Sequence, residues 1–253
     1  MSAPPKVYAG PNDRLRSSSL STLGRCAGLH LAQRESDEPG AAADTGSAVG
    51  RGAQLWHEGA TLGDAVAQVE RESATKFPLA RLEEATETIR RYTQDERNAP
   101  TAAFHCELEI DLVLPCWPGD PTGESIHIRG HLDQIRRGQD GRLYVWDLKN
   151  GKPTGFDMVH GYAWQLASYA IGATQKLGQV VLPGGIVRTQ GYTVKGDPSV
   201  ANVFYETPWS HEQCKAMLDN VAYLVMLIRR GDVLRTPGAH CGWCSLSPAT
   251  CSL

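Results

Sequence analysis

The chain has 253 residues, of which 41% are hydrophobic and 21% are charged, and its formal net charge is −3. This composition is typical of a folded globular protein, and the small negative charge excludes nucleic-acid binding through overall basicity. No apolar run approaches the roughly 20 residues that span a bilayer and the N-terminus lacks the apolar segment of a secretory signal, so we expect a cytoplasmic protein, or one in the host cytoplasm if a phage encodes it.

The N-terminal part is predicted to be mainly helical. Residues 1–16 are predicted to be a flexible tail, and residues 17–26 a helix start, because serine hydroxyls accept hydrogen bonds from free backbone N–H groups. The polar stretch 35–50 is predicted to be a loop. Residues 51–72 and 78–98 carry charged residues at helical spacing, which indicates two amphipathic helices.

Strands follow in the middle of the chain. Residues 104–114 alternate apolar and polar side chains, which is the pattern of a half-buried strand. Residues 126–135 and 142–148 are two further strand-like runs. The Asp-Gly pair in residues 138–141 predicts a hairpin turn between them.

The remaining elements complete an expected α/β domain. A helix is predicted over 156–176 with Gly178 as its C-terminal stop, and a second amphipathic helix over 210–230, with weaker strands at 185–194 and 201–206 between them. We expect one domain over residues 17–253. Its parts are a helical region (17–100), a core (101–206) and a C-terminal helix with a cysteine-rich segment (207–253).

The hairpin is predicted to bring two carboxylates together. If Arg137 lies opposite Arg142, then Asp133 lies opposite Trp146 or Asp147. Like charges that lie opposite each other destabilise a sheet, so two carboxylates in such positions indicate that a cation lies between them.

The residues after Trp146 add a lysine beside the expected cation. Asp147 and Lys149 share one face of the strand, while Trp146 and Leu148 point into the packing. A hard divalent ion on oxygen ligands activates water for phosphodiester hydrolysis. Lys149 would orient the attacking water or stabilise charge on the phosphate.

Gln165 and Tyr169 are four residues apart on the next predicted helix and are therefore neighbours on one face. Met158 and Tyr162 continue that face, and a buried core stripe explains them well. The polar Gln165 indicates that part of the stripe faces the active site or the substrate.

Together, Gly130-His-Leu-Asp133, Asp147-Leu-Lys149 and Gln165-Leu-Ala-Ser-Tyr169 resemble the RecB-type branch of the PD-(D/E)XK nuclease superfamily. The resemblance implies a restriction-endonuclease-like core, with a central mixed sheet flanked by helices, and Lys149 as the catalytic lysine. Upstream, Gly52-Ala-Gln-Leu-Trp-His57 is similar to that branch's helical histidine motif.

By the same resemblance, His57, Asp133 and Asp147 would ligate Mg²⁺ or Mn²⁺ with help from the Leu148 carbonyl. Glu107 is similar to an acidic residue on the preceding strand of that branch, and Glu109 is the alternative. The sequence departs from the pattern at Asn150, where many relatives have threonine or serine.

The seven cysteines divide into two groups. Cys106, Cys116 and Cys214 have no partner spacing and are expected to be small buried hydrophobic residues. The other four resemble the one-plus-three arrangement that holds a [4Fe–4S] cluster in iron–sulfur RecB-family exonucleases, such as the AddB subunit and the CRISPR-associated exonucleases. These four are Cys26, Cys241, Cys244 and Cys251. Four thiolates also fit structural Zn²⁺, and spacing alone does not decide between them.

The sequence therefore predicts a metal-dependent DNA nuclease, in particular an exonuclease that acts on free ends or single strands in recombination, repair or DNA processing. It contains no phosphate-binding loop of an ATPase, so it would act alone or with a separate helicase. The alternatives are a non-catalytic nucleic-acid-binding protein with a cysteine-ligated metal and, with little support, an iron–sulfur electron carrier. The sequence gives no oligomeric state or cleavage polarity.

Overall fold

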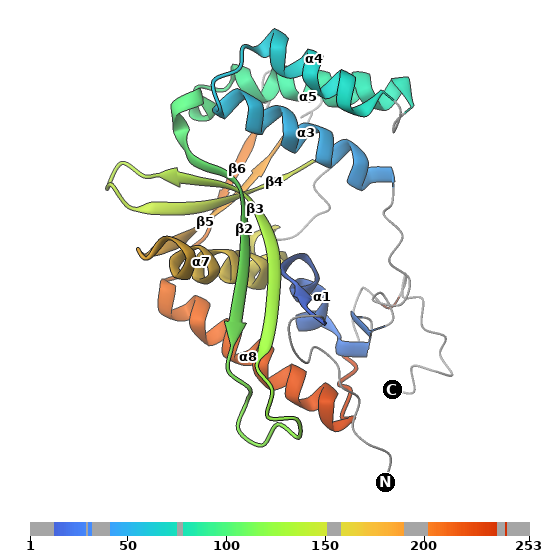
Figure 1. Ribbon diagram of the computed structural model, residues 1–253, viewed down its shortest axis with the longest axis vertical. Helices are drawn as coiled ribbons and strands as arrows, with labels where there is room; N and C mark the ends of the chain where they lie inside the picture. Colours follow the sequence, from blue (N-terminus) through green and yellow to red (C-terminus); the bar gives the residue numbers. More distant parts are fainter. Residues whose placement is uncertain are drawn as a thin grey trace.

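The computed structural model describes residues 13–28, 30–31, 41–74, 78–150, 158–189, 202–236 and 241. A central sheet lies between two groups of helices (Figure 1), with α3, α4 and α5 on one side and α7 and α8 on the other. The described helices are α1 (Leu20–Arg25), α3 (Ala41–His57), α4 (Leu62–Ser73), α5 (Leu79–Gln94), α6 (Met158–Gly161), α7 (Ala163–Leu177) and α8 (His211–Arg230). The strands are β1 (Leu15–Arg16), β2 (Ala103–Leu114), β3 (Ile126–Arg137), β4 (Leu143–Lys149), β5 (Val181–Arg188) and β6 (Val203–Glu206).

The sheet is mixed and six-stranded, in the order β1-β3-β4-β5-β6, and β2 also pairs with β3. Strands β2, β3 and β4 are antiparallel neighbours, whereas β4 and β5 are parallel. Parallel neighbours need a crossover connection, and α7 is part of the connection from β4 to β5. This arrangement confirms the expected α/β fold with a mixed sheet between helices.

Helix α7 is covered on two sides, which explains why it is apolar over most of its surface. Leu166 and Ala170 pack in the cluster beneath β3, β4 and β5. Ala167 and Ile171 belong to a second cluster, which α8 completes. Because both sides are packed, α7 is a fixed support for the side chains that it presents to the sheet.

The prediction for the segment before residue 72 is wrong in two respects. The described part of the expected loop, residues 41–50, is helical, because Ala48 and Val49 pack into the core formed with α4 and α5; this packing overrides the weak helix propensity of the two glycines there. The expected helix over 51–72 is interrupted, since α3 ends at His57 and α4 begins at Leu62. Gly59 has a left-handed conformation (φ 95°) and Thr61 caps α4.

The helix expected over 156–176 is divided at Tyr162 into α6 and α7, so Met158 lies on a different helix from Gln165. Elsewhere the predicted elements are confirmed with shifted ends. Gly178 ends α7 in a left-handed conformation, and α8 begins with a capping box between Ser210 and Gln213. Strand β5 begins at Val181, earlier than predicted, because an irregular register against β4 accommodates the Pro-Gly-Gly sequence that resembles a turn. Strand β1, which pairs with β3, lies in the segment predicted to be a tail.

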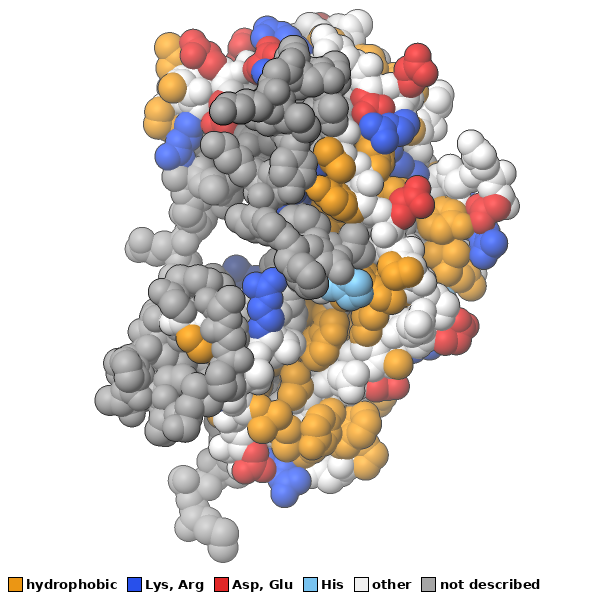
Figure 2. Space-filling model, turned by 180° about the vertical axis from the view of Figure 1, so that it is seen from behind, with side chains coloured by type: hydrophobic (Ala, Val, Ile, Leu, Met, Phe, Trp, Pro, Cys, Tyr) orange, Lys and Arg blue, Asp and Glu red, His pale blue; other side chains and the backbone are white. Residues whose placement is uncertain are grey.

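The surface of the described residues carries basic, acidic and hydrophobic side chains next to one another (Figure 2). On the face shown in Figure 2, the lysine and arginine side chains are separated by acidic and hydrophobic ones, and hydrophobic side chains gather at the level where Figure 1 places α8. None of the helices in the described ranges has the length and apolarity to cross a membrane.

Candidate active site

The β3–β4 hairpin places Asp133 and Asp147 beside each other. Arg137 pairs with Leu143 rather than with Arg142, so the turn is one residue longer than predicted. The paired register ends at Gln134 and Trp146, and its continuation puts Asp133 opposite Asp147. The observed register therefore agrees with the prediction that Asp133 lies opposite Trp146 or Asp147.

The strand alternation separates two kinds of side chain on β4. Trp146 and Leu148 pack in a hydrophobic cluster with Tyr92, on the face opposite to Asp147 and Lys149. The Lys149 Nζ atom lies 2.7 Å from Asp147 Oδ2, and the Asp147 side chain is only 2% exposed. The Leu148 N–H donates to Asp133 Oδ2, which fixes that carboxylate at the point where β3 and β4 separate.

When both carboxylates are ionised, these three groups carry one buried negative charge without a counter-charge. Burial and the neighbouring Asp147 carboxylate raise the pKa of Asp133 well above its usual value. Burial opposes the charge on Lys149, but Asp147 and Asp133 outweigh this effect and raise its pKa. Two ionised carboxylates against one ammonium are stable in such a place only with a further cation.

The three side chains line a cavity of about 630 Å³. Helix α7 contributes Gln165 and Tyr169, which were predicted to face the active site. The Gln165 amide donates to Asp147 Oδ1 (3.2 Å) and to the Tyr169 hydroxyl (2.9 Å). Gln165 thus fixes the orientation of the Asp147 carboxylate from a rigid helix.

Glu107 lines the same cavity, whereas Glu109 is not among the lining residues. Glu107 has a left-handed backbone (φ 52°) between two residues that pair with β3, a conformation that is uncommon outside glycine. Burial raises the pKa of Glu107. Glu109 instead pairs with Arg129 at 3.1 Å, with half of its side chain exposed. The geometry favours Glu107 as the acidic residue of this strand.

His57 does not line the cavity. Its Nε2 atom lies 2.7 Å from the Tyr92 hydroxyl and its Nδ1 atom 3.2 Å from the Pro100 carbonyl. Burial lowers the pKa of His57 to about 4. Both ring nitrogens are therefore engaged within the protein. The structure does not bring this residue to the two aspartates.

Helix α3 reaches the cavity one turn before His57, through residues that the sequence did not single out. Arg51 and Gln54 line the cavity, and Arg51 is held by Glu72 (3.1 Å) and by Gln54 (2.9 Å). Gly46, Ser47 and Gly50 line it from the same helix. Gly46, Ser47, Gly50 and Arg51 precede Gln54 by eight, seven, four and three residues, a spacing that places them on one side of a helix. Residues 35–50 were instead predicted to be a loop.

The donor set fits a hard divalent cation. The donors are the Asp133 and Asp147 carboxylates and the Leu148 carbonyl. Within the described ranges, no three His, Cys, Asp or Glu side chains converge as a complete metal cage. Mg²⁺ is commonly held by one or two carboxylates, with water and substrate phosphate as its other ligands, so two carboxylates in an accessible cavity are sufficient.

The described cysteines only partly test the expected cluster. Cys26 is buried and Cys241 is exposed, while Cys244 and Cys251 lie outside the described residues. The Gly28 N–H donates to the Leu234 carbonyl at 3.3 Å, so the segment after Cys26 meets the segment before Cys241. Of the three cysteines expected to be buried, Cys214 lies in the core, whereas Cys106 and Cys116 are only partly buried.

Comparison with known proteins found matches among protein families and among solved structures. The PD-(D/E)XK nuclease superfamily matches residues 15–251, whereas a search of curated proteins found no match. One similar solved structure is a protein from Eubacterium rectale described as a candidate exonuclease, with 14% identity, a TM-score of 0.52, and coverage of 92% of this chain and 88% of that chain. Another is SSO0001, with 13% identity, a TM-score of 0.46, and coverage of 95% and 88%.

At 14% identity the similarity to the Eubacterium rectale protein shows the fold alone, and the mixed sheet flanked by helices is consistent with a restriction-endonuclease-like fold. The superfamily match spans nearly the whole described core, including Asp133, Asp147 and Lys149. The chain belongs to the PD-(D/E)XK nuclease superfamily.

Proposed function

We propose that this nuclease is a divalent-metal-dependent deoxyribonuclease, and in particular an exonuclease that serves DNA recombination, repair or processing. The observation that carries the proposal is the grouping of Asp133, Asp147 and Lys149 in one cavity, with the Lys149 ammonium 2.7 Å from the Asp147 carboxylate. Free ends or single strands are the expected substrate, because the catalytic groups lie in a concave cavity between α3 and α7 and not on a flat surface.

Asp133, Asp147 and the Leu148 carbonyl would hold Mg²⁺ or Mn²⁺. The ion would supply Lewis-acid polarisation of the scissile phosphate. Lys149 keeps its proton, because the two aspartates raise its pKa. Its Nζ can therefore donate to a phosphate oxygen as negative charge develops, or orient the attacking water.

The α7 side chains position this machinery. Gln165 holds Asp147 Oδ1, so the carboxylate presents a fixed edge to the cavity. Burial and Asp147 raise the pKa of Tyr169 well above its usual value. Its hydroxyl consequently stays protonated. It accepts from Gln165 and can donate its own proton to a substrate phosphate.

The test compares linear and circular DNA, labelled at one end, with Mn²⁺ or Mg²⁺ and with a chelator. We expect wild-type protein to degrade linear DNA, and Asp147→Ala to lose at least about a hundredfold in rate, as is typical when charge stabilisation is removed. Asp219→Ala, at an exposed position of α8, is the matched control. Equal rates for wild type and Asp147→Ala would refute the assignment. Cleavage of circular DNA at the same rate would make the enzyme an endonuclease.

We also propose that Cys26, Cys241, Cys244 and Cys251 hold a [4Fe–4S] cluster. The hydrogen bond from Gly28 to the Leu234 carbonyl supports this, because it brings the two ends of the domain together. The cluster would stabilise the fold more than it would change the chemistry. Iron and sulfide analysis of anaerobically purified protein is the test, and a finding of zinc alone would replace the cluster with structural Zn²⁺ without affecting the nuclease.

A further inference from the structure

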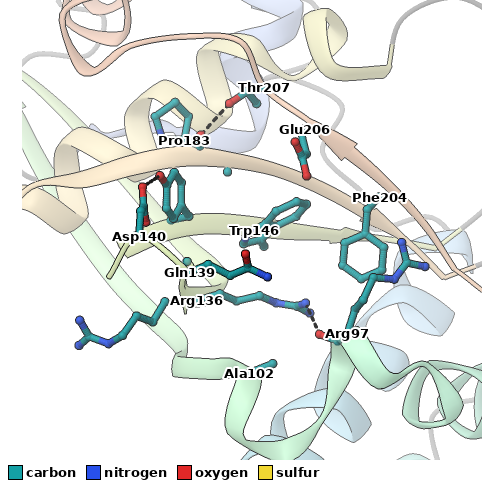
Figure 3. A pocket seen from close by; sticks show the side chains of 14 residues that line it. Arg97, Ala102, Arg136, Gln139, Asp140, Trp146, Pro183, Phe204, Glu206 and Thr207 are labelled. Atoms are coloured by element: carbon teal, nitrogen blue, oxygen red, sulfur yellow. Dashed lines mark hydrogen bonds between the residues drawn. The ribbon is translucent and has the colours of Figure 1, made fainter. Parts of the chain in front are cut away.

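A second cavity, of about 620 Å³, lies on the other face of the sheet from the catalytic aspartates. Tyr144 and Trp146 of β4 line it, and they alternate with residues of the catalytic face. The β3–β4 turn, Pro183 of β5 and Phe204 of β6 complete its walls (Figure 3). Its volume lies within the range of about 300–1,000 Å³ that is typical of small-molecule sites.

Aromatic rings make up much of this cavity. The Trp146 and Phe204 rings meet edge to face, with centroids 5.5 Å apart. Tyr144 is held by a hydrogen bond from its hydroxyl to Asp140 (2.6 Å). Figure 3 shows the Trp146 ring in the middle of the cavity, with Gln139 on one side and Glu206 on the other. A flat ring that entered here would meet an aromatic wall and polar groups at its edges.

Guanidinium groups surround these rings. Arg136 is 7% exposed and donates to Tyr92, Asn98 and the Arg97 carbonyl, so its position is fixed. Its Cζ atom lies 5.8 Å from the Trp146 ring centroid and 5.4 Å from that of Phe204. The Arg97 Cζ atom lies 4.0 Å from Phe204. Such a site favours a ligand that is both aromatic and anionic.

Arg137 adds a cation at the edge of the cavity. It is exposed, its Nη1 donates to the Gly141 carbonyl (2.8 Å), and its Cζ atom lies 5.0 Å from the Phe104 ring. The charged side chains that line the cavity are three arginines and two carboxylates, Asp140 and Glu206. Their balance is positive, whereas the whole chain carries −3.

We propose that this cavity binds an unpaired nucleobase of a single-stranded DNA substrate, with the base stacked on Trp146 and an adjoining phosphate near Arg137. Gln139 and Glu206 offer an amide and a carboxylate to the edge of the base. A base within a duplex is stacked and paired and cannot enter, so the site selects single strands. The inference rests on the proposed nuclease function and names the part of the substrate that lies away from the cleaved bond.

The distance between the two sites sets the length of substrate that is needed. Strand β4 carries both of them, with Trp146 in one and Asp147 in the other, and its whole length is about 23 Å at about 3.3 Å per residue. Trp146 and Asp147 point to opposite faces of β4, so a strand that engages both must pass around the edge of the sheet. Only an oligonucleotide of many residues engages both, and a single-nucleotide substrate occupies the catalytic cavity alone.

The test uses variants that change the cavity without removing packed side chains. Gln139→Trp fills it from an exposed position in the turn. Arg137→Gln removes the proposed phosphate contact, and Arg142→Gln is its control, because Arg142 is also exposed in the same hairpin but does not line the cavity. Binding of a fluorescent 20-residue single strand and of the matching duplex is measured by anisotropy in a chelator, and cleavage of thymidine 5′-(p-nitrophenyl phosphate) is measured with Mn²⁺.

We expect Gln139→Trp to bind the single strand about tenfold more weakly, the typical effect of losing one stacked base, with unchanged duplex binding and unchanged cleavage of the small ester. Arg137→Gln should lower the slope of log affinity against log salt by about 0.7, and Arg142→Gln should leave it unchanged. Wild-type affinity in Gln139→Trp, or equal slopes for the two arginine variants, overturns the inference alone. A wild-type protein that neither binds the strand nor cleaves the ester overturns the proposed function as well.

Discussion

The charge imbalance around Asp133 leads to a prediction about stability. We expect Asp133→Asn to retain the stability of the metal-free protein while losing the stabilisation that Mg²⁺ or Mn²⁺ provides. The asparagine Oδ1 atom can still accept from the Leu148 N–H, which now bonds to Asp133 Oδ2. The substitution also removes a carboxylate whose pKa is raised by burial and by Asp147, so it removes an unfavourable charge from the metal-free site.

The magnitude follows from ligand linkage. A metal that binds only the folded state, at a free concentration about 100 times its dissociation constant, stabilises by about 2.7 kcal/mol. For a domain of this size, 1 kcal/mol shifts Tm by about 2–4 °C, so wild type should gain about 5–10 °C. Asp133→Asn loses one of two carboxylate ligands, and we expect it to gain less than about 2 °C at the same concentration.

Lys149→Met separates metal binding from catalysis. The Lys149 ammonium now lies 2.7 Å from Asp147 Oδ2, and its removal leaves the metal as the main counter-charge for both carboxylates. We therefore expect this variant to be less stable than wild type in a chelator, to gain at least the wild-type Tm shift with metal, and to lose cleavage. Methionine fills similar space without a charge.

The assay is thermal unfolding of the three proteins, stripped with a chelator and titrated with Mg²⁺ or Mn²⁺ at constant ionic strength. The reasoning fails if Asp133→Asn gains the same Tm shift as wild type, because the metal would then bind elsewhere. It also fails if metal-free Asp133→Asn is less stable by several kcal/mol, since the carboxylate would then be a net stabilising group without metal.

Three further predictions test individual contacts. Burial lowers the folded-state pKa of His57 to about 4, so the folded protein binds fewer protons than the unfolded chain. The free energy of unfolding should therefore fall by up to about 3 kcal/mol as the pH drops from about 6.5 to 4. Unfolding of His57→Gln should depend less on pH across this range, and identical profiles for the variant and wild type would contradict the prediction. A Cβ atom at Gly130 would lie 2.7 Å from Tyr169 Cε1 and close to Ser17. We therefore expect Gly130→Ala to lower the free energy of unfolding, measured with denaturant, by about 1–3 kcal/mol and to slow cleavage by displacing Tyr169. Gly46→Ala is the control, because a Cβ atom there would lie in open space and should not destabilise the protein. Glu107→Gln should slow cleavage about 10- to 100-fold, while Glu109→Gln, outside the cavity, should not; equal rates would remove Glu107 from the site.

The sequence predicted best where local rules determine the structure. The predicted hairpin turn and the alternation of side chains along β4 were sufficient to place Asp133 beside Asp147 within one residue, although the turn is one residue longer than predicted. Helix α8 was predicted almost to its ends, because Ser210 and Gly231 are typical capping residues.

The N-terminal wall of the cavity could not be predicted in the same way. Thr45, Gly46 and Gly50 lower the helix propensity of α3, and only its packing against α4 and α5 makes the segment helical. Without that tertiary information the cavity-lining role of Arg51 was not visible. The same limit affected His57, whose ring nitrogens meet Tyr92 and Pro100, residues far away in the sequence.

The two faces of β4 let one short strand contribute both to the proposed catalytic site and to the proposed base-binding cavity. Asp147 and Lys149 face the catalytic cavity, and Tyr144 and Trp146 face the second one. A slip of one residue in the pairing with β3 would exchange these faces and place two charged groups in an aromatic cluster. The pairing is held on both sides, by the antiparallel register with β3 and by the parallel register with β5. The rigidity that sets the metal site therefore also sets the second cavity, so substitutions that loosen the β4–β5 pairing should weaken strand binding and cleavage together, whereas substitutions within either cavity should affect one without the other.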